Sequence, residues 1–360
     1  MKFFVKTLST VICAALVFSA VLFCACDMGE EQHFTAFNGT FVTVQSRNKR
    51  LSSVATENIR ALLSDLNAEF SATDENSTVY KINAAAAGEE TAISDRFKFI
   101  ADECKKLRDF TDGKFDPSVY PLTLLWRFAP NFPVHDFAVP QAEEIAAAKA
   151  TVGYDKFSFK SAAVKTTDKA KLDFGGIIKG YAADKIAEIM KVDGVTEGFV
   201  NIGGSSIYVI ATDNLSVTHP REDGKNIITV KLNETDLSVS TSGDYRKNYV
   251  KDGKTYSHII DPYTGYPQDT GVASATVIGK NGVKLDALTT AMCLFGHDFD
   301  APENGELYAF IQKILSSEEF EGAQVFAVCV KENKKQILTN KKQGEDFTLL
   351  DNSYTVINLS

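Results

Sequence analysis

The residues best suited to bind a phosphate or a metal ion stand where glycines and polar side chains interrupt apolar segments. In residues 172–181 (LDFGGIIKGY), Asp173 ends an expected strand and Gly175-Gly176 leads into an expected helix. Such a turn lets the backbone approach a ligand closely and directs helix N–H groups at an anion, and Lys179 adds a positive charge there. The segment alone is as consistent with a tight connection, and the GxxxxGK[ST] spacing of a P-loop is absent.

A carboxylate and a hydroxyl stand one helical turn apart near residue 290. Asp286 and Thr290 are separated by four positions in the segment DALTT, so on a helix their oxygens face the same side. Such a pair suits Mg²⁺, which keeps waters and substrate phosphate oxygens as its other ligands. The competing interpretation is that Asp286 caps the start of the helix, and the spacing alone favours that simpler role.

His258 is the candidate for acid–base chemistry. It lies between Ser257 and two isoleucines in an expected strand, where a histidine is more often packed and hydrogen-bonded than catalytic. Its neighbours Ser257, Asp261 and Thr264 could fix its tautomer and tune its pKa, as a general base requires. Residues 261–265 (DPYTG) have the composition of a turn.

Two further segments carry weaker signals. Asn201 precedes Gly203-Gly204 at an expected strand end, which is typical of a bulge or a hairpin turn. Residues 113–122 contain aromatic and carboxylate side chains ahead of the single tryptophan, Trp126, in no spacing that indicates a chemistry. A structural turn is the default interpretation of both.

The elements that position these residues follow from hydrophobic periodicity. Apolar residues at helical spacing predict amphipathic helices over residues 59–70 and 97–107, and an alanine-rich helix over 141–151. Further helices are expected at 180–191, 285–295 and 307–315. Strands are expected at 41–44, 157–160, 171–174, 198–203, 206–211, 227–232, 237–241, 256–260, 272–279 and 324–330. Because helices and strands do not alternate strictly and short turns join neighbouring strands, the predicted class is α+β rather than a doubly wound sheet.

Composition limits the partners of the chain. It has 360 residues, 44% of them hydrophobic and 24% charged, with a net charge of −9, which is typical of a globular protein and unfavourable for binding nucleic acid. A site for a phosphorylated ligand must therefore be built locally, from metal, backbone N–H groups or a few cations. Cys104, Cys293 and Cys329 are too scattered for a disulfide framework or a zinc site, and we expect them to be buried thiols.

The N-terminus predicts export. Lys2 and Lys6 precede an almost wholly apolar stretch at 8–23, and an acidic segment follows Cys26. We therefore expect residues 1–26 to be a signal peptide with a lipobox-like end, 27–33 a short tether and 34–360 one domain. Lipidation of Cys26 would hold the protein on the periplasmic side of a bacterial membrane, because two acyl chains anchor firmly. A simple cleaved signal or an uncleaved anchor is the alternative.

Taken together and in this order, the segments resemble the FAD:protein FMN transferases, the ApbE-like flavin transferase family. The match runs from about Phe34 to the C-terminus. The resemblance implies a single α+β domain of two mixed α/β lobes, with antiparallel sheets and an FAD cleft between the lobes. The motifs that carry it are residues 38–40 (NGT), 113–119 (GKFDPSV), 172–180 (LDFGGIIKG), 201–204 (NIGG), 241–245 (TSGDY), 258–265 (HIIDPYTG) and 286–291 (DALTTA).

The resemblance also assigns roles to individual residues. By analogy the Mg²⁺ ligands are Asp286, Thr290 and the Gly176 carbonyl, with Thr289 beside them. FAD contacts are implied for Phe115, Asp116, Asp173, Lys179 and Ile260, and for Asn38 and Thr73 at the flavin. His258 matches the histidine that activates the acceptor hydroxyl. Asn38 stands where many members have Met and Thr73 where an aromatic residue is common, so a looser flavin could favour FAD hydrolysis.

The implied activity is Mg²⁺-dependent transfer of FMN from FAD to a Ser or Thr hydroxyl of an acceptor redox protein, with release of AMP. One alternative is a Mg²⁺-dependent FAD pyrophosphatase that yields FMN and AMP. Another is a lipoprotein that binds FAD without catalysis and has no use for His258.

Overall fold

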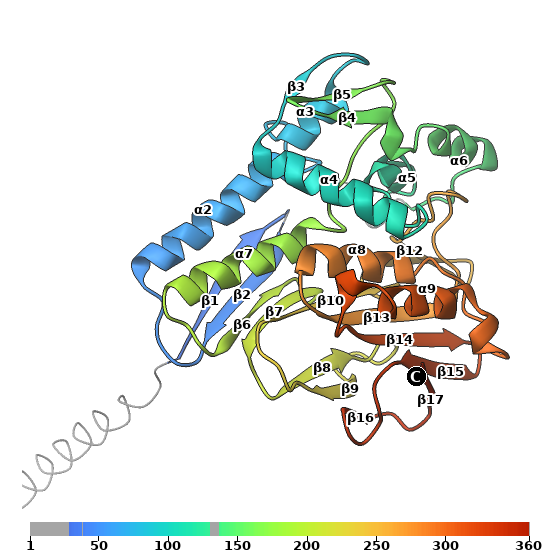
Figure 1. Ribbon diagram of the computed structural model, residues 1–360. Helices are drawn as coiled ribbons and strands as arrows, with labels where there is room; N and C mark the ends of the chain where they lie inside the picture. Colours follow the sequence, from blue (N-terminus) through green and yellow to red (C-terminus); the bar gives the residue numbers. More distant parts are fainter. Residues whose placement is uncertain (1–28, 38, 130–136, 360) are drawn as a thin grey trace, which may run out of the picture.

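The molecule is organised around one large, mainly antiparallel sheet (Figure 1). The computed structural model describes residues 29–37, 39–129 and 137–359. Every neighbouring pair in the sheet is antiparallel except β15 and β17. The strand order is β1 (Glu30–Ala36), β2 (Thr40–Ser46), β6 (Gly198–Ile202), β7 (Ser206–Ala211), β10 (Leu237–Gly243), β13 (Val272–Gly279), β14 (Gln324–Lys331), β15 (Lys334–Thr339) and β17 (Thr355–Asn358).

Three small sheets accompany the large one. They are β16 (Phe347–Leu349) with β9 (Asn226–Lys231) and β8 (Asn214–Thr218); β3 (Thr91–Ala92) with β5 (Ala162–Lys165) and β4 (Phe157–Phe159); and the pair β11 (Asn248–Lys251) and β12 (Lys254–Ser257). The α+β class and the antiparallel sheets predicted from the sequence are confirmed.

Helices cover one face of the large sheet, and the β16-β9-β8 sheet covers part of the other. The helices are α2 (Ser53–Phe70), α3 (Thr78–Ala84), α4 (Asp95–Phe110), α5 (Tyr120–Leu125), α6 (Ala142–Lys149), α7 (Ile178–Val192), α8 (Gly282–Met292) and α9 (Glu306–Leu315). Short 3₁₀ turns lie at Pro117–Val119, Tyr154–Lys156, Pro302–Asn304 and Glu318–Phe320. Helices α3 to α6 and the β3-β5-β4 sheet gather at the top of Figure 1, away from the small sheet.

Strand β14 shows why both faces of the large sheet are buried. Val325 and Ala327 belong to the core under the helices, whereas Phe326 and Val328 belong to the core against the small sheet. Successive side chains of a strand point to opposite faces, so a strand covered on both sides is apolar throughout. The apolar run at 325–330 is therefore continuous, and the strand predicted at 324–330 is confirmed.

Helix α2 forms because one side of it is apolar and its start is capped. Ile59, Leu63, Leu66 and Phe70 are buried, and the Ser52 side chain accepts a hydrogen bond from the N–H of the residue three positions on. This confirms the helix predicted from the spacing of these residues. The helices predicted at 97–107, 141–151, 180–191 and 307–315 likewise coincide with α4, α6, α7 and α9.

Two predicted segments, at 171–174 and at 27–33, differ in the structure. The strand predicted at 171–174 does not form, because the Asn83 side chain takes the place of a neighbouring strand. Its Nδ2 donates to the Leu172 carbonyl at 2.9 Å and its Oδ1 accepts from the Leu172 N–H at 2.7 Å. The tether predicted at 27–33 is also too long, since residues from Glu30 onward pair with β2 in strand β1.

Helix α8 begins earlier than predicted, which changes the meaning of Asp286. The cap is Asn281, whose side chain accepts from the Lys284 N–H, so Asp286 lies inside the helix. The alternative in which Asp286 caps the helix is therefore wrong. Helix α8 crosses α7 so closely that a Cβ on Gly180 would lie 2.0 Å from the Gly282 carbonyl oxygen. Glycine at that position brings the two site-bearing helices together.

The remaining cysteines are buried free thiols, as predicted: Cys104, Cys293 and Cys329. Cys26 lies outside the described residues. Within the described parts of the chain, no helix is both long and apolar enough to cross a bilayer.

Candidate active site

One cavity of about 740 Å³ brings the predicted segments together. It lies where strand β2 begins and strands β6 and β10 end, and residues between 114 and 128 form another part of its wall. Its walls include ten of the twelve predicted site residues: Thr73, Phe115, Asp116, Asp173, Gly176, Lys179, His258, Ile260, Asp286 and Thr290. Asn38 lies outside the described residues, and Thr289 is placed behind the wall.

Asp286 lies at the buried floor of this cavity and is 2% exposed. Its Oδ1 accepts from the Ser240 hydroxyl at 3.0 Å, and its Oδ2 accepts from the Gly180 N–H at 3.2 Å. Lys179 Nζ lies 3.5 Å from the same Oδ2. These donors hold the carboxylate in one orientation, and a carboxylate is a ligand for a hard cation.

Gly176 lines the same cavity as Asp286, and among the described residues its carbonyl lacks the usual helical partner. In a regular helix the Gly180 N–H would bond to it, but here that N–H donates to Asp286. Among the hydrogen bonds of the described residues, none ends on the Gly176 carbonyl oxygen. A Cβ on Gly176 would lie 3.7 Å from Thr290 Oγ1, so the backbone here passes close to that hydroxyl. A carbonyl, a carboxylate and a hydroxyl thus belong to residues that line the same cavity.

The two threonines that follow Asp286 occupy different positions. Thr290 lines the cavity, and its Oγ1 lies 3.3 Å from Ser242 Oγ. Thr289 is fully buried, donates to the Asp286 carbonyl at 3.1 Å and contacts Ser242 Oγ at 3.0 Å. The structure therefore places Thr289 in support of Ser242 and of helix α8, not on the surface that a ligand meets.

Among the described residues, His258 has one ring nitrogen held by a hydrogen bond and the other free to act. Its backbone N–H and its ring Nδ1 both lie 3.0 Å from the Lys247 carbonyl oxygen. A carbonyl only accepts, so Nδ1 carries the hydrogen and Nε2 carries the lone pair. Burial lowers the pKa of His258 to about 4, and the positive charges of Lys247, Lys179 and Arg246 act in the same direction. The ring is therefore neutral at pH 7, as a general base must be.

The partner of this histidine was not the one expected. Ser257, Asp261 and Thr264 were its predicted partners, but Ser257 Oγ accepts from the Ile259 N–H, and Asp261 pairs with Lys114 at 2.8 Å. Residues 261–265 do form a turn, closed by the Gly265 N–H donating to the Asp261 carbonyl at 2.8 Å.

Asp173 and Lys179 flank the glycine pair. Burial raises the pKa of Asp173, while its bond from the Gly175 N–H at 2.8 Å and the charge of Lys179 oppose that effect. Lys179 Nζ also donates to the Gly175 carbonyl. The two charged groups thus hold residues 173–179 in one conformation near Asp286, at the floor of the cavity.

The other predicted contacts form the apolar and rigid parts of the wall. Phe115 and Ile260 are 4% exposed and present carbon to the cavity. The Asp116 carboxylate is occupied by structure, because it accepts from Arg108 Nε at 2.9 Å and from Ser118 N–H and Oγ. Thr73 lines the wall near Ser71, with 3.4 Å between the two hydroxyl oxygens.

Sequence reasoning missed two cations that follow β10. Arg246 donates to the carbonyls of Gly203 and Gly204, and the Lys247 ammonium donates to the Phe128 carbonyl. Burial lowers the pKa of Lys247, and Asp173 opposes that effect. Only their place two and three residues after the TSGD segment, residues 241–244, could have indicated them.

The cavity has a different charge balance from the chain. Its described lining residues include four cationic side chains, Lys114, Lys179, Arg246 and Lys247, and three carboxylates, Asp116, Asp173 and Asp286. A chain of net charge −9 thus builds a local site that a phosphorylated ligand can enter.

Known proteins resemble this chain along most of its length. The ApbE family profile matches residues 38–302. A Vibrio cholerae protein named FAD:protein FMN transferase is 29% identical over 246 residues, covering 67% of this chain and 73% of that protein. The Escherichia coli K12 protein of the same name is 28% identical over 304 residues, covering 78% of this chain and 86% of that protein.

Solved structures of related proteins share the fold. The Thermotoga maritima ApbE protein is 30% identical and superimposes with a TM-score of 0.71, over 84% of this chain and 94% of that chain. The flavin transferase ApbE from Vibrio cholerae is 25% identical, also with a TM-score of 0.71, over 86% of this chain and 97% of that chain.

Proposed function

We propose, since this chain belongs to the ApbE family, that it is an FAD:protein FMN transferase, which cleaves FAD and attaches the FMN half to a hydroxyl of another protein. One observation carries the proposal. A neutral histidine with a free Nε2, a buried carboxylate and four cationic side chains share one cavity of about 740 Å³. That volume is in the range of pockets that hold large cofactors.

We further propose that Mg²⁺ is held at the floor of the cavity. The donors fit this ion, since Asp286 supplies a carboxylate, Thr290 a hydroxyl and Gly176 a carbonyl oxygen that no described helix N–H uses. Hard oxygen donors of this kind are those that Mg²⁺ selects. When bound, the ion neutralises negative charge on phosphate oxygens.

The protein's own groups account for the rest of the reaction. An acceptor Ser or Thr hydroxyl attacks the phosphorus of the FMN half, the new O–P bond forms, and the O–P bond to AMP breaks. The hydroxyl proton passes to Nε2 of His258, and AMP leaves with the bonding electron pair. Lys179 and Arg246, both on the cavity wall, supply positive charge near the diphosphate.

His258 suits this step because it is held in one tautomer. Its Nδ1–H is bound to the Lys247 carbonyl, so the lone pair stands only on Nε2. General-base assistance of this kind typically accelerates a reaction by about 10²–10⁴-fold. A lipoprotein that only stored FAD would have no use for such a group.

We also propose that the protein works outside the cytoplasm on a bacterial membrane, anchored by lipid on Cys26. The apolar stretch at 8–23 and the cysteine after it support this. Strand β1 begins at Glu30, four residues beyond that cysteine, so the domain would stand close to the membrane surface. Acceptors would then be membrane redox proteins that expose a Ser- or Thr-containing segment on the same side.

The proposal is tested by incubating the protein with FAD, Mg²⁺ and a recombinant redox domain that carries a Ser/Thr flavinylation motif. We expect flavin fluorescence to co-migrate with the redox domain after denaturation, with one AMP released per flavin attached. Release of AMP and free FMN alone would identify a pyrophosphatase instead. Intact FAD after prolonged incubation would identify a binding protein.

A further inference from the structure

The loop after β10, residues 244–247, controls several parts of the site at once. Arg246 and Lys247 line the cavity, and the Lys247 carbonyl accepts both hydrogen bonds that orient His258. A displacement of this loop would therefore move the base and two cations together. The residues that hold this loop in place therefore contribute to the function of the site.

Arg221 clamps the first residue of this loop from outside the cavity. Its Nη1 donates to Asp244 Oδ1 at 2.6 Å and its Nη2 donates to Asp244 Oδ2 at 2.8 Å. Such a fork-to-fork pair fixes orientation as well as distance. Arg221 follows strand β8 of the small sheet and does not line the cavity among the described residues, so it reaches the site only through Asp244.

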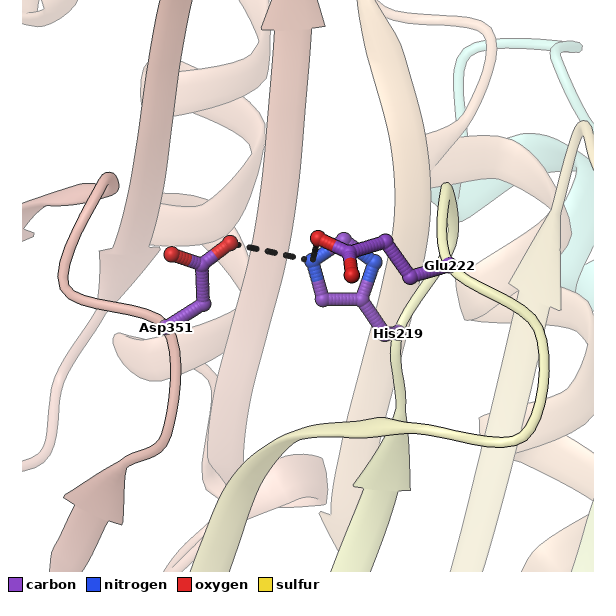
Figure 2. Close-up of side chains that lie close together, drawn as sticks. All are labelled: His219, Glu222 and Asp351. Atoms are coloured by element: carbon purple, nitrogen blue, oxygen red, sulfur yellow. Dashed lines mark hydrogen bonds and ion pairs between the residues drawn. The ribbon is translucent and has the colours of Figure 1, made fainter.

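The main chain of Arg221 is fixed in turn by the cluster in Figure 2. The Arg221 N–H donates to His219 Nδ1 at 3.1 Å, and His219 Nε2 lies 3.2 Å from Asp351 Oδ2 and 3.8 Å from Glu222 Oε1. His219 is 3% exposed. The cluster ties the segment after β8 to the C-terminal segment that follows β16.

The cluster contains metal-binding atoms within 4.8 Å of one another, but its hydrogen bonds exclude that use. A histidine that ligates a metal through one nitrogen donates the hydrogen on the other. Here Nδ1 accepts from a backbone N–H, so Nε2 carries the hydrogen and points it at Asp351. The three side chains are therefore an anchor for the segment that bears Arg221.

We infer that Arg221 is a positioning residue for FMN transfer, acting through Asp244 on the loop whose Lys247 carbonyl orients His258. The inference rests on the proposed function and adds to it a part of the machinery that never touches FAD. Misplacement of a catalytic group by about 1 Å typically lowers a rate by about 100-fold. Loss of the clamp should therefore affect turnover more than FAD binding.

The kinetic test compares Arg221→Met and Arg221→Lys with Arg60→Met, using FAD, Mg²⁺ and the redox domain as substrates. Arg60 is a matched control, because it is an exposed arginine on α2 that lies 3.7 Å from Glu57. We expect Arg221→Met to lower kcat about 10–100-fold with KM for FAD changed less than about threefold. Arg221→Lys, which keeps one charged donor, should recover part of the loss, and Arg60→Met should match the wild type.

A double-mutant comparison separates positioning from a general structural role. In a His258→Ala background, Arg221→Met should lower the residual rate by a clearly smaller factor than in the wild type, because the base is gone and only the loop cations Arg246 and Lys247 can still be displaced. The same fold-loss in both backgrounds, or an Arg221→Met rate within about twofold of wild type, would overturn the inference.

A third measurement does not depend on turnover. Ring ¹⁵N NMR of His258, assigned by its loss in His258→Ala, should report the Nδ1–H tautomer in the wild type and a mixture of tautomers in Arg221→Met. An unchanged tautomer in Arg221→Met contradicts the inference. If the wild type neither labels the redox domain nor cleaves FAD, the proposed function fails, and the NMR result still decides whether Arg221 orients His258.

Discussion

The rate of FMN transfer at low pH tests how far the cavity lowers the pKa of His258. Burial and the nearby charges of Lys247, Lys179 and Arg246 bring its pKa to about 4, against about 6.5 for an unperturbed histidine. With a pKa of about 4, about 90% of the base remains unprotonated at pH 5, whereas an unperturbed histidine would retain only about 3%. Transfer should therefore be almost constant from pH 7 to pH 5 and fall to half near pH 4.

The assay measures initial rates of FMN attachment after a jump from pH 7, with near-UV circular dichroism to verify that the protein stays folded. This check matters because the pKa of His258 is lower in the folded protein than in the unfolded chain. As the pH falls, the unfolded chain therefore binds the proton at a higher pH than the folded protein does. Stability is therefore lost as the pH falls from about 6.5 towards about 4. A half-maximal rate near pH 6.5 in the folded protein would refute the reasoning.

The matched control is His258→Ala. This variant should bind FAD with unchanged affinity and transfer FMN about 10²–10⁴-fold more slowly, because only the base is removed. Burial also raises the pKa of Asp173. A fall in rate at low pH that persists in His258→Ala therefore comes from Asp173 or another group. Only the part of the fall that disappears with the imidazole reports the pKa of His258. Labelling at the wild-type rate would exclude His258 as the base.

Three further predictions test other parts of the structure. Asp286→Asn should reduce FAD cleavage at least about 100-fold and abolish its dependence on Mg²⁺ in a metal titration; undiminished cleavage would remove this carboxylate from the site. Gly180→Ala should lower the free energy of unfolding in urea by about 1–3 kcal/mol or more, since the added Cβ would lie 2.0 Å from the Gly282 carbonyl oxygen; wild-type stability would show that the two helices can separate freely. Trp126→Phe should cost about 1–3 kcal/mol in thermal melts, because it leaves the buried Gly265 carbonyl without its 2.8 Å bond from Nε1, and an unchanged Tm would contradict this.

Much of the fold was predictable because its signals are local. The spacing of Ile59, Leu63 and Leu66 alone predicts α2, and the apolar run at 325–330 predicts β14. Where a distant residue supplies the hydrogen bonds, local signals fail. Residues 171–174 have the composition of a strand, but the side chain of Asn83 satisfies the Leu172 backbone instead.

In the site, too, local signals were predictable and contacts from distant residues were not. Glycine pairs and the Asp286–Thr290 spacing indicate which segments matter, and the cavity does bring them together. The partner that fixes the tautomer of His258 is the carbonyl of Lys247, eleven residues earlier in the chain. A backbone carbonyl carries no sequence signal, so neither this contact nor the inward position of Lys247 could be predicted.

The most direct test of FMN transfer is the intact mass of the acceptor. After incubation with FAD, Mg²⁺ and the wild-type protein, the redox domain should gain the mass of one FMN group. The gain should disappear when its acceptor Ser or Thr is replaced by Ala. An unmodified acceptor, recovered from a reaction in which the same enzyme has converted FAD to AMP and free FMN, would contradict the account.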